Sequence, residues 1–306
     1  MLIPFAPLRR TRHTGAVTTR DGIGWALLAG LAGTCLYLFA QAPWQLLVPS
    51  ALPPLAIAAL LLVWGRPPRG HWPALFAALL WGIVAAPALS AGLNEVGIAL
   101  MRLAGWSDAK ALAAVVVAPL VEELCKAAGI ALVAALWRGA LRGLVDGIAL
   151  GVLVGVGFTI GENLHYLAFA LLGGGSAGLL EGTYLRGVLG GLLHPTFAAA
   201  SGAGLGAARQ ARGAAWRAAL PLIGVLAAIV QHLAWNAVGA DWLRAAPCGP
   251  ATAGCALGGE LRFALLVAPA IVLPFVMPGM ALLAYLARRA AGRAAAKVSP
   301  ARGELR

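Results

Sequence analysis

The chain has 306 residues, of which 61% are hydrophobic and only 11% are charged, and its formal net charge is +12. A soluble domain carries about 25% charged residues, and a chain this apolar lacks the polar groups to cover its surface in water. The composition therefore excludes an ordinary soluble protein. It also makes nucleic-acid binding a poor explanation of the positive charge, because the basic residues fall between apolar runs.

Eight apolar stretches are long enough to be transmembrane helices, since about 20 mostly apolar residues cross a bilayer. The sequence therefore predicts an all-α, polytopic integral membrane protein that forms a single transmembrane domain over residues 1–306. The eight predicted spans are approximately 23–42, 46–64, 73–100, 110–137, 142–172, 184–207, 218–240 and 261–287.

The connections between these spans differ strongly in positive charge. Counted over the two tails and alternate connections, 17 basic residues fall on one side and 5 on the other, while Lys126 lies inside a span. Basic residues are enriched in cytoplasmic loops. This asymmetry predicts that both termini are cytoplasmic, and an even number of spans agrees with that orientation.

The fourth span contains three ionisable residues within five positions, namely Glu122, Glu123 and Lys126. Each would cost roughly 2.5–3.5 kcal/mol at bilayer depth, so such residues usually mark function. Glu122 and Lys126 are four residues apart and share a helix face. A purely structural intramembrane ion pair is the alternative interpretation.

The fifth span combines a glycine repeat with a polar pair. Small residues spaced four apart allow close helix packing, so the glycines predict a central position for this helix. Glu162 and Asn163 follow Phe158 further along the span, and capping of a broken helix is their alternative role. The glycines are Gly143, Gly147, Gly151 and Gly155.

The sixth and seventh spans add His194 and then His232 with Asn236. At about 1.5 Å per residue, Glu122, Glu162, His194 and His232 all lie roughly 12–17 Å below the outer surface. Four helices of alternating direction thus bring polar groups to one level. A single histidine would more often be a hydrogen-bonded packing residue, but coincidence with carboxylates at one depth favours a site.

The last outward loop contains Cys248 and Cys255. A disulfide between them suits an oxidising exterior, and two free thiols are the alternative.

The chemistry available at the predicted level is that of hydrolysis. A carboxylate can deprotonate a water molecule, and His or Asn side chains can donate hydrogen bonds to a developing oxyanion. A faint serine-type alternative would pair Ser201 with His232, but it leaves the glutamates unexplained. A transporter or proton pathway would also use buried Glu, Lys and His, and a non-catalytic membrane scaffold is a third possibility.

Four ordered motifs resemble the PrsW family of intramembrane proteases. They are Glu-Glu-x-x-Lys at 122–126, Phe-x-x-x-Glu-Asn at 158–163, His194, and His-x-x-x-Asn at 232–236, all within the motif-bearing core at 110–240. The family is related to the CAAX-prenyl-protease-like membrane proteins, which are regarded as glutamic proteases. It has also been classed with the metallopeptidases.

The resemblance implies a role for each matching residue. Glu122 would be the water-activating base and Glu123 its partner, and Glu162, His194 and His232 would complete the site. Asn236 would donate to the oxyanion, with Lys126, Phe158 and Asn163 in support. It further implies the bacterial cytoplasmic membrane as location, the lipid bilayer as surroundings, and a single-pass membrane protein such as an anti-sigma factor as substrate.

A metal-free mechanism is favoured by the sequence, with zinc as the alternative. Zinc is commonly bound by His and carboxylate ligands with one position open for water, and Glu122, Glu162, His194 and His232 offer such a set. However, no two of them have the spacing of a zinc motif on one helix, and Lys126 would repel a cation.

Overall fold

A computed structural model of the chain describes residues 19–65, 71–249 and 255–298. The described residues form helices and contain no strand, as expected where the bilayer leaves backbone groups no partner outside the chain. The predicted all-α fold is confirmed. Its α-helices are α1 (Thr19–Gln41), α2 (Trp44–Gly65), α3 (Trp72–Leu80), α4 (Ala86–Leu103), α5 (Ala109–Leu112), α6 (Ala118–Leu136), α7 (Leu144–Gly182), α8 (Leu193–Gln210), α9 (Ala214–Ala234), α10 (Ala240–Ala245), α11 (Leu257–Arg262) and α12 (Ala268–Val298).

Short segments of different pitch continue several of these helices without a loop. Five are π-helical and one, η4 (Gly190–Leu192), is a 3-10 turn. π-Helical turns inside longer helices are rare overall, and many of those that occur lie at functional sites. The five are η1 (Trp81–Ala85), η2 (Ala113–Val117), η3 (Thr183–Leu189), η5 (Trp235–Gly239) and η6 (Phe263–Val267).

Each of the eight predicted spans lies on a helical stretch of the described chain, and the fifth and sixth share the stretch Leu144–Gln210. Five helical stretches among the described residues are long and apolar enough to cross a membrane. One of them, Leu144–Gln210, reverses direction at Gly175, which has a positive φ of 60°. The exact number of spans therefore stays a prediction.

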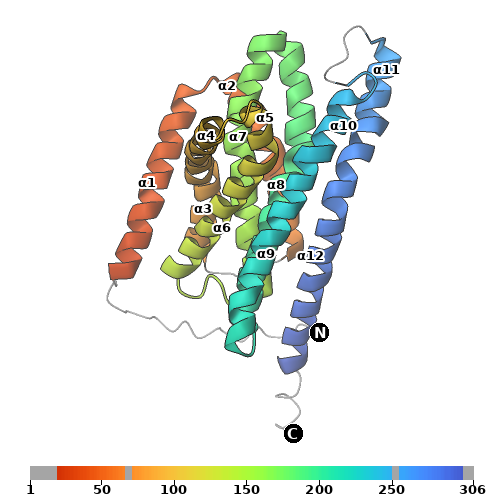
Figure 1. Ribbon diagram of the computed structural model, residues 1–306. Helices are drawn as coiled ribbons and strands as arrows, with labels where there is room; N and C mark the ends of the chain where they lie inside the picture. The colour runs from red at the N-terminus through yellow and green to blue at the C-terminus, as the bar shows by residue number, and fades with distance from the viewer. Residues whose placement is uncertain (1–18, 66–70, 250–254, 299–306) are drawn as a thin grey trace, which may run out of the picture.

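The orientation of the chain also stays a prediction. The first described helix begins and α12 ends at the same end of the bundle (Figure 1), as an even number of spans requires. Part of the basic charge behind the predicted orientation lies outside the described residues, namely Arg9, Arg10, Arg12, Arg66, Arg69, Arg302 and Arg306.

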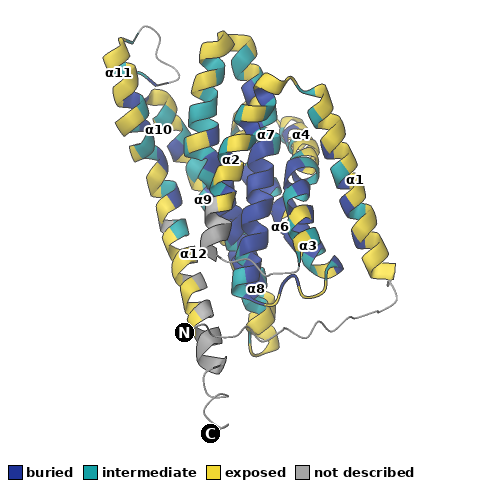
Figure 2. Ribbon diagram, turned by 180° about the vertical axis from the view of Figure 1, so that it is seen from behind, coloured by how far each residue is buried: buried dark blue, intermediate teal, exposed yellow. Residues whose placement is uncertain are grey.

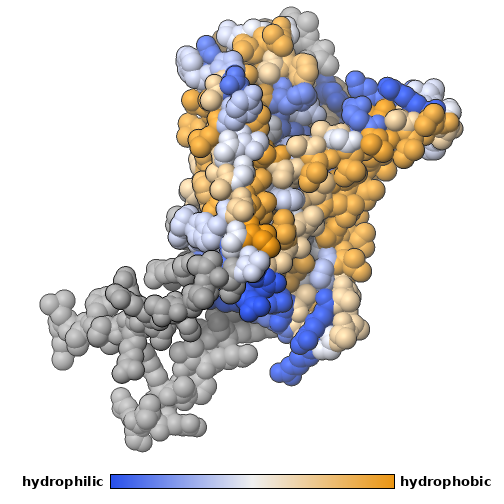
Figure 3. Space-filling view, turned by 90° about the vertical axis from the view of Figure 1, so that its left-hand side faces the viewer, coloured by the Kyte–Doolittle hydropathy of each residue, from blue (hydrophilic) through white to orange (hydrophobic). Residues whose placement is uncertain are grey.

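The core of the bundle is the pair α7 and α8, which appear dark blue at the centre of Figure 2, whereas much of α1 and α12 is exposed. Large apolar side chains such as Leu36, Leu172 and Leu265 are exposed on the periphery. The face in Figure 3 is mostly hydrophobic along its middle, with hydrophilic residues towards both ends. This pattern is that of a protein surrounded by lipid.

The glycine repeat of α7 packs against α8 by direct backbone contact, as the sequence predicts. A Cβ atom on Gly147 would overlap the Gly202 carbonyl, and one on Gly155 would overlap the backbone of His194 and Pro195. Because α8 carries His194, this close packing fixes the position of a predicted site residue.

Gly155→Ala is expected to destabilise the protein by about 1–3 kcal/mol, the usual cost of overpacking a close contact. The matched control is Gly173→Ala on the same helix, since nothing lies within 4 Å of a Cβ at that position. Thermal unfolding in detergent measures both. Equal stability of the two variants would contradict the packing role of Gly155.

Cys248 and Cys255 form a disulfide between α10 and α11, so the predicted pairing is confirmed. Cys35 and Cys125 are free and buried, and at such positions cysteine acts as a small hydrophobe.

Candidate active site

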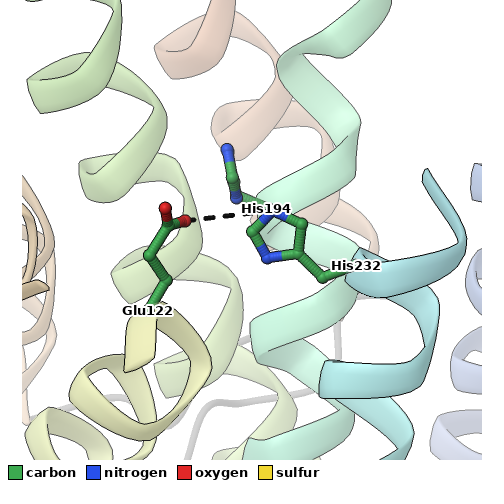
Figure 4. A group of neighbouring side chains, drawn as sticks. All are labelled: Glu122, His194 and His232. Atoms are coloured by element: carbon green, nitrogen blue, oxygen red, sulfur yellow. Dashed lines mark ion pairs between the residues drawn. The ribbon is translucent and has the colours of Figure 1, made fainter. Parts of the chain in front are cut away.

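Three helices bring their predicted polar residues to one place. Glu122 comes from α6, His194 from α8 and His232 from α9, and Figure 4 shows the three side chains pointing towards one another. One ligand-type atom from each lies within 4.8 Å of those of the other two, and all three residues are buried. The convergence expected from the helical depths is therefore present in the structure.

His232 lies between the two adjacent glutamates. Its Nδ1 is 2.9 Å from Glu123 Oε1, and its Nε2 is 3.9 Å from Glu122 Oε2. An ionised carboxylate only accepts hydrogen bonds, so we assign the ring proton to Nδ1, which donates to Glu123. His232 Nε2 then has a free lone pair directed to the side of Glu122.

His194 is held in a similar way by Glu162 of α7. Its Nε2 is 2.9 Å from Glu162 Oε2, while its Nδ1 is 3.0 Å from Lys126 Nζ. Because an ammonium group only donates, Lys126 donates to Nδ1 and the ring proton lies on Nε2, which donates to Glu162. Both histidines are thus oriented by a carboxylate on one ring nitrogen.

Lys126 is fully buried and contacts most of the cluster. Its Nζ is 2.7 Å from Glu123 Oε1 and 3.7 Å from Glu122 Oε2, and it lies 3.8 Å from the centre of the Phe158 ring. A buried charge is tolerated only when it is paired and hydrogen-bonded. Lys126 therefore supplies a positive charge beside two neighbouring carboxylates, and Phe158 packs against its ammonium.

Glu162 lies beside the cluster rather than in it. Its Oε2 accepts from Arg186 Nη2 at 2.6 Å as well as from His194. The predicted four-residue metal set is therefore corrected to three residues, because this carboxylate is committed to its own cation. Arg186 also stacks on Tyr166, 3.8 Å from the ring centre.

Arg186 is the site residue that sequence reasoning missed. It counts as an outer-loop charge in the predicted topology, but the structure places it in η3, where it pairs with Glu162. Arg186 precedes His194 by about two helical turns within the predicted sixth span, and this spacing places both on the same helix face.

Neither of the two predicted asparagines hydrogen-bonds to a residue of the cluster in the described chain. Asn236 Nδ2 donates to the Ala114 carbonyl of η2 at 2.9 Å, and its oxyanion role stays a prediction. Asn163 is buried, and neither of its amide atoms has a hydrogen-bond partner among the described residues. Asn236 follows His232 by one helical turn and so lies on the same helix face, but its amide bonds to a backbone carbonyl of a neighbouring helix.

The serine alternative gains no support from the geometry. Ser201 is fully buried, and its hydroxyl has no hydrogen-bond partner in the described part of the chain. A serine nucleophile needs a base within hydrogen-bond reach, but His232 Nε2 lies on the side of Glu122, 3.9 Å from its Oε2, and makes no hydrogen bond to Ser201.

Glu122 is the carboxylate that remains available for chemistry. Its Oε2 accepts no hydrogen bond from any described residue, although Lys126 and His232 lie nearby. Lys126 has three N–H donors, of which Glu123 and His194 take two. A free base and a free cationic donor thus lie side by side in a buried site.

The same residues fit a metal ion. Glu122, His194 and His232 form a compact set of one carboxylate and two imidazoles, which is a common ligand set for zinc with one open position. Each histidine also has a carboxylate on its other nitrogen, as metal-binding histidines usually do. Against this stands Lys126, whose ammonium is already in contact with two of the three ligands.

A family model described as PrsW family intramembrane metalloprotease matches residues 70–273. The matched region exceeds half of the chain and contains every residue of the cluster. Comparison with curated proteins and with solved structures finds no match.

Proposed function

Because the chain belongs to the PrsW family of intramembrane proteases, we propose that it hydrolyses a peptide bond of a single-pass membrane protein with a water molecule activated by Glu122. The observation that carries this proposal is the free Glu122 Oε2 beside a buried cation and an imidazole lone pair. An anti-sigma factor is a suitable substrate, and the bacterial cytoplasmic membrane is the proposed location.

Glu122 would act as general base. It takes a proton from water while the water oxygen attacks the carbonyl carbon of the substrate, and the remaining N–H of Lys126 stabilises the developing oxyanion. Collapse of the tetrahedral intermediate breaks the C–N bond, and the proton passes from Glu122 to the leaving nitrogen. The lone pair of His232 Nε2 offers a second acceptor for the attacking water.

The other charged groups have positioning roles in this proposal. Glu123 holds the ring of His232 and one N–H of Lys126, and Glu162 holds the ring of His194. Arg186 keeps Glu162 in place from the outer side. A site held by such a supporting shell is preorganised for catalysis.

A metal-assisted mechanism is the second candidate, favoured by the compact ligand set and by the description of the family model. Glu122, His194 and His232 would hold the ion, which would lower the pKa of a bound water. The metal-free mechanism remains our proposal, because Lys126 already places a positive charge against Glu122 and His194 and would repel a cation.

Chelation decides between these mechanisms. We expect the purified protein to contain no stoichiometric zinc and to keep its activity after treatment with a strong chelator, since the base and the oxyanion donor are side chains. Elemental analysis and turnover are measured on the same preparation. Loss of zinc together with activity, and recovery of both when zinc is added back, would establish the metal mechanism instead.

The test of the function itself is cleavage by purified protein. The full chain is reconstituted in vesicles with a panel of single-pass membrane proteins that includes anti-sigma factors, and products are identified by mass spectrometry. Cleavage within or next to the apolar segment supports the proposal. Absence of cleavage across the panel, together with protein-dependent proton or ion flux, would favour the transporter alternative.

A further inference from the structure

A proline leaves one backbone carbonyl of η2 without its helical partner. The Ala118 N–H bonds to the Ala113 carbonyl, five residues back. The next bond in this register would join residue 119 to the Ala114 carbonyl, but Pro119 has no N–H. Asn236 of η5 donates its side-chain amide to that carbonyl instead, at 2.9 Å.

A π-helical turn followed by a proline also occurs at η1 and at η6, and at η6 a side chain again bonds to the vacant carbonyl. In η6 the Ala268 N–H bonds to the Phe263 carbonyl, Pro269 follows, and the Ala264 carbonyl accepts from the Tyr184 hydroxyl. That pair is partly buried, whereas the pair of Asn236 and Ala114 is exposed. An exposed donor and acceptor at a membrane span can exchange partners with another chain.

The exposed pair lies beside the candidate site. Asn236 follows His232 by one helical turn, and Ala114 precedes Glu122 by about two turns. The segments that carry the pair, η2 and η5, continue directly into α6 and α9, which carry the base and the imidazole that face each other. A chain segment inserted at the pair would run directly towards Glu122.

The seam between α6 and α9 differs from the two seams that α8 makes with α7 and α9. The α7–α8 and α8–α9 seams are closed by backbone contacts at glycines, such as Gly202 with Gly147 and Gly204 with Gly224. No described glycine makes such a contact between α6 and α9, and α9 contacts α8 far more extensively than α6. The α6–α9 seam can therefore part with less loss of packing than the α7–α8 or the α8–α9 seam.

From these observations we infer that the substrate enters between α6 and α9, and that an unwound stretch of its transmembrane segment replaces the bond between Asn236 and Ala114. A backbone N–H of the substrate binds the Ala114 carbonyl, and a backbone carbonyl of the substrate accepts from Asn236. This inference rests on the proposed protease function.

The Asn236 amide and the Ala114 carbonyl provide one hydrogen-bond donor and one acceptor, which suit an extended peptide. A transmembrane helix satisfies its own backbone groups, so a segment that unwinds to expose a peptide bond needs new partners within the bilayer. One carbonyl and one amide side by side present the donor and acceptor pattern that a neighbouring strand presents. A lipid tail would leave both groups of the pair unsatisfied.

Photo-crosslinking maps the entrance. The probe is a synthetic peptide with one apolar segment of about 20 residues, in vesicles of phosphatidylethanolamine and phosphatidylglycerol, with the Glu122→Gln protein so that the peptide persists. Benzoylphenylalanine is placed at Val121 and Leu233, which lie at helical spacing from Ala114 and Asn236. Matched controls are Val230 and Leu282, which line a separate groove between α9 and α12. Crosslinking is expected to be several-fold stronger at the first two positions.

Asn236→Ala gives an independent kinetic readout. Loss of one hydrogen bond to the substrate backbone is expected to raise KM about tenfold. The kcat value should stay within a factor of about two of wild type, because this contact is equally strong in the ground state and the transition state. A fall in kcat at unchanged KM would assign Asn236 to the oxyanion and overturn the inference.

These experiments distinguish failure of the proposed entry route between α6 and α9 from failure of the proposed protease function. Crosslinking reports binding whether or not cleavage occurs. Strongest crosslinking at Val230 and Leu282, or equal crosslinking at all four positions, overturns the entrance even if the wild-type protein cleaves the peptide. If the wild-type protein cleaves nothing, the protease function fails, whatever the crosslinking pattern.

Discussion

Glu122→Gln should abolish proteolysis in a protein that still folds. The substitution removes a buried carboxylate oxygen that accepts no hydrogen bond from any described residue and lies 3.9 Å from His232 Nε2. General-base catalysis contributes typically 10²–10⁴-fold, so turnover of a cleaved single-pass protein should fall by at least about 100-fold. The amide has nearly the same shape, and the fold should persist.

The matched comparison uses the neighbouring and the rival residues. Glu123→Gln and His194→Ala are also expected to abolish turnover, because they release His232 or Lys126 from the geometry that Glu122 needs. Ser201→Ala should keep full activity. Wild-type turnover by a well-folded Glu122→Gln protein would show that this carboxylate is not the base, and selective loss in Ser201→Ala would establish a serine mechanism.

Depth along a helix could be predicted from the sequence because it depends only on residue count and on the direction of each span. Glu122, His194 and His232 are therefore found together, as their estimated depths require. The glycine spacing of α7 similarly predicts which helix lies in the centre, since only small residues permit backbone contact. Both inferences use only the regular geometry of the α-helix, namely its rise per residue and its number of residues per turn.

The partner of each polar side chain could not be predicted in the same way. Asn236 shares a face with His232, yet it donates to a carbonyl of η2 that a proline and a π-helical turn make available. Glu162 has the expected depth, but Arg186 from the next span takes its carboxylate away from the metal-type set. Such pairings depend on helix rotation and on local breaks in the helix, which residue spacing does not determine.

Lys126→Met should destabilise the protein strongly, by about 3–5 kcal/mol, because it leaves two buried carboxylates without their counter-charge. The ammonium is 2.7 Å from Glu123 and 3.7 Å from Glu122, and Glu123 and Lys126 are fully buried. Thermal or denaturant unfolding in detergent measures the loss. Lys110→Met, at an exposed position near the start of the same helical stretch, should change stability by less than about 0.5 kcal/mol.

A second substitution separates lost charge pairing from lost packing. Removing the uncompensated charge with Glu123→Gln in the Lys126→Met background should restore part of the stability, so that the double variant is more stable than the sum of the two single effects predicts. Strict additivity would indicate that Lys126 stabilises the protein through its contact with Phe158. Activity should remain absent in the double variant, because the ammonium is also the proposed oxyanion donor. Turnover by a stable Lys126→Met/Glu123→Gln protein would assign that donor to another group.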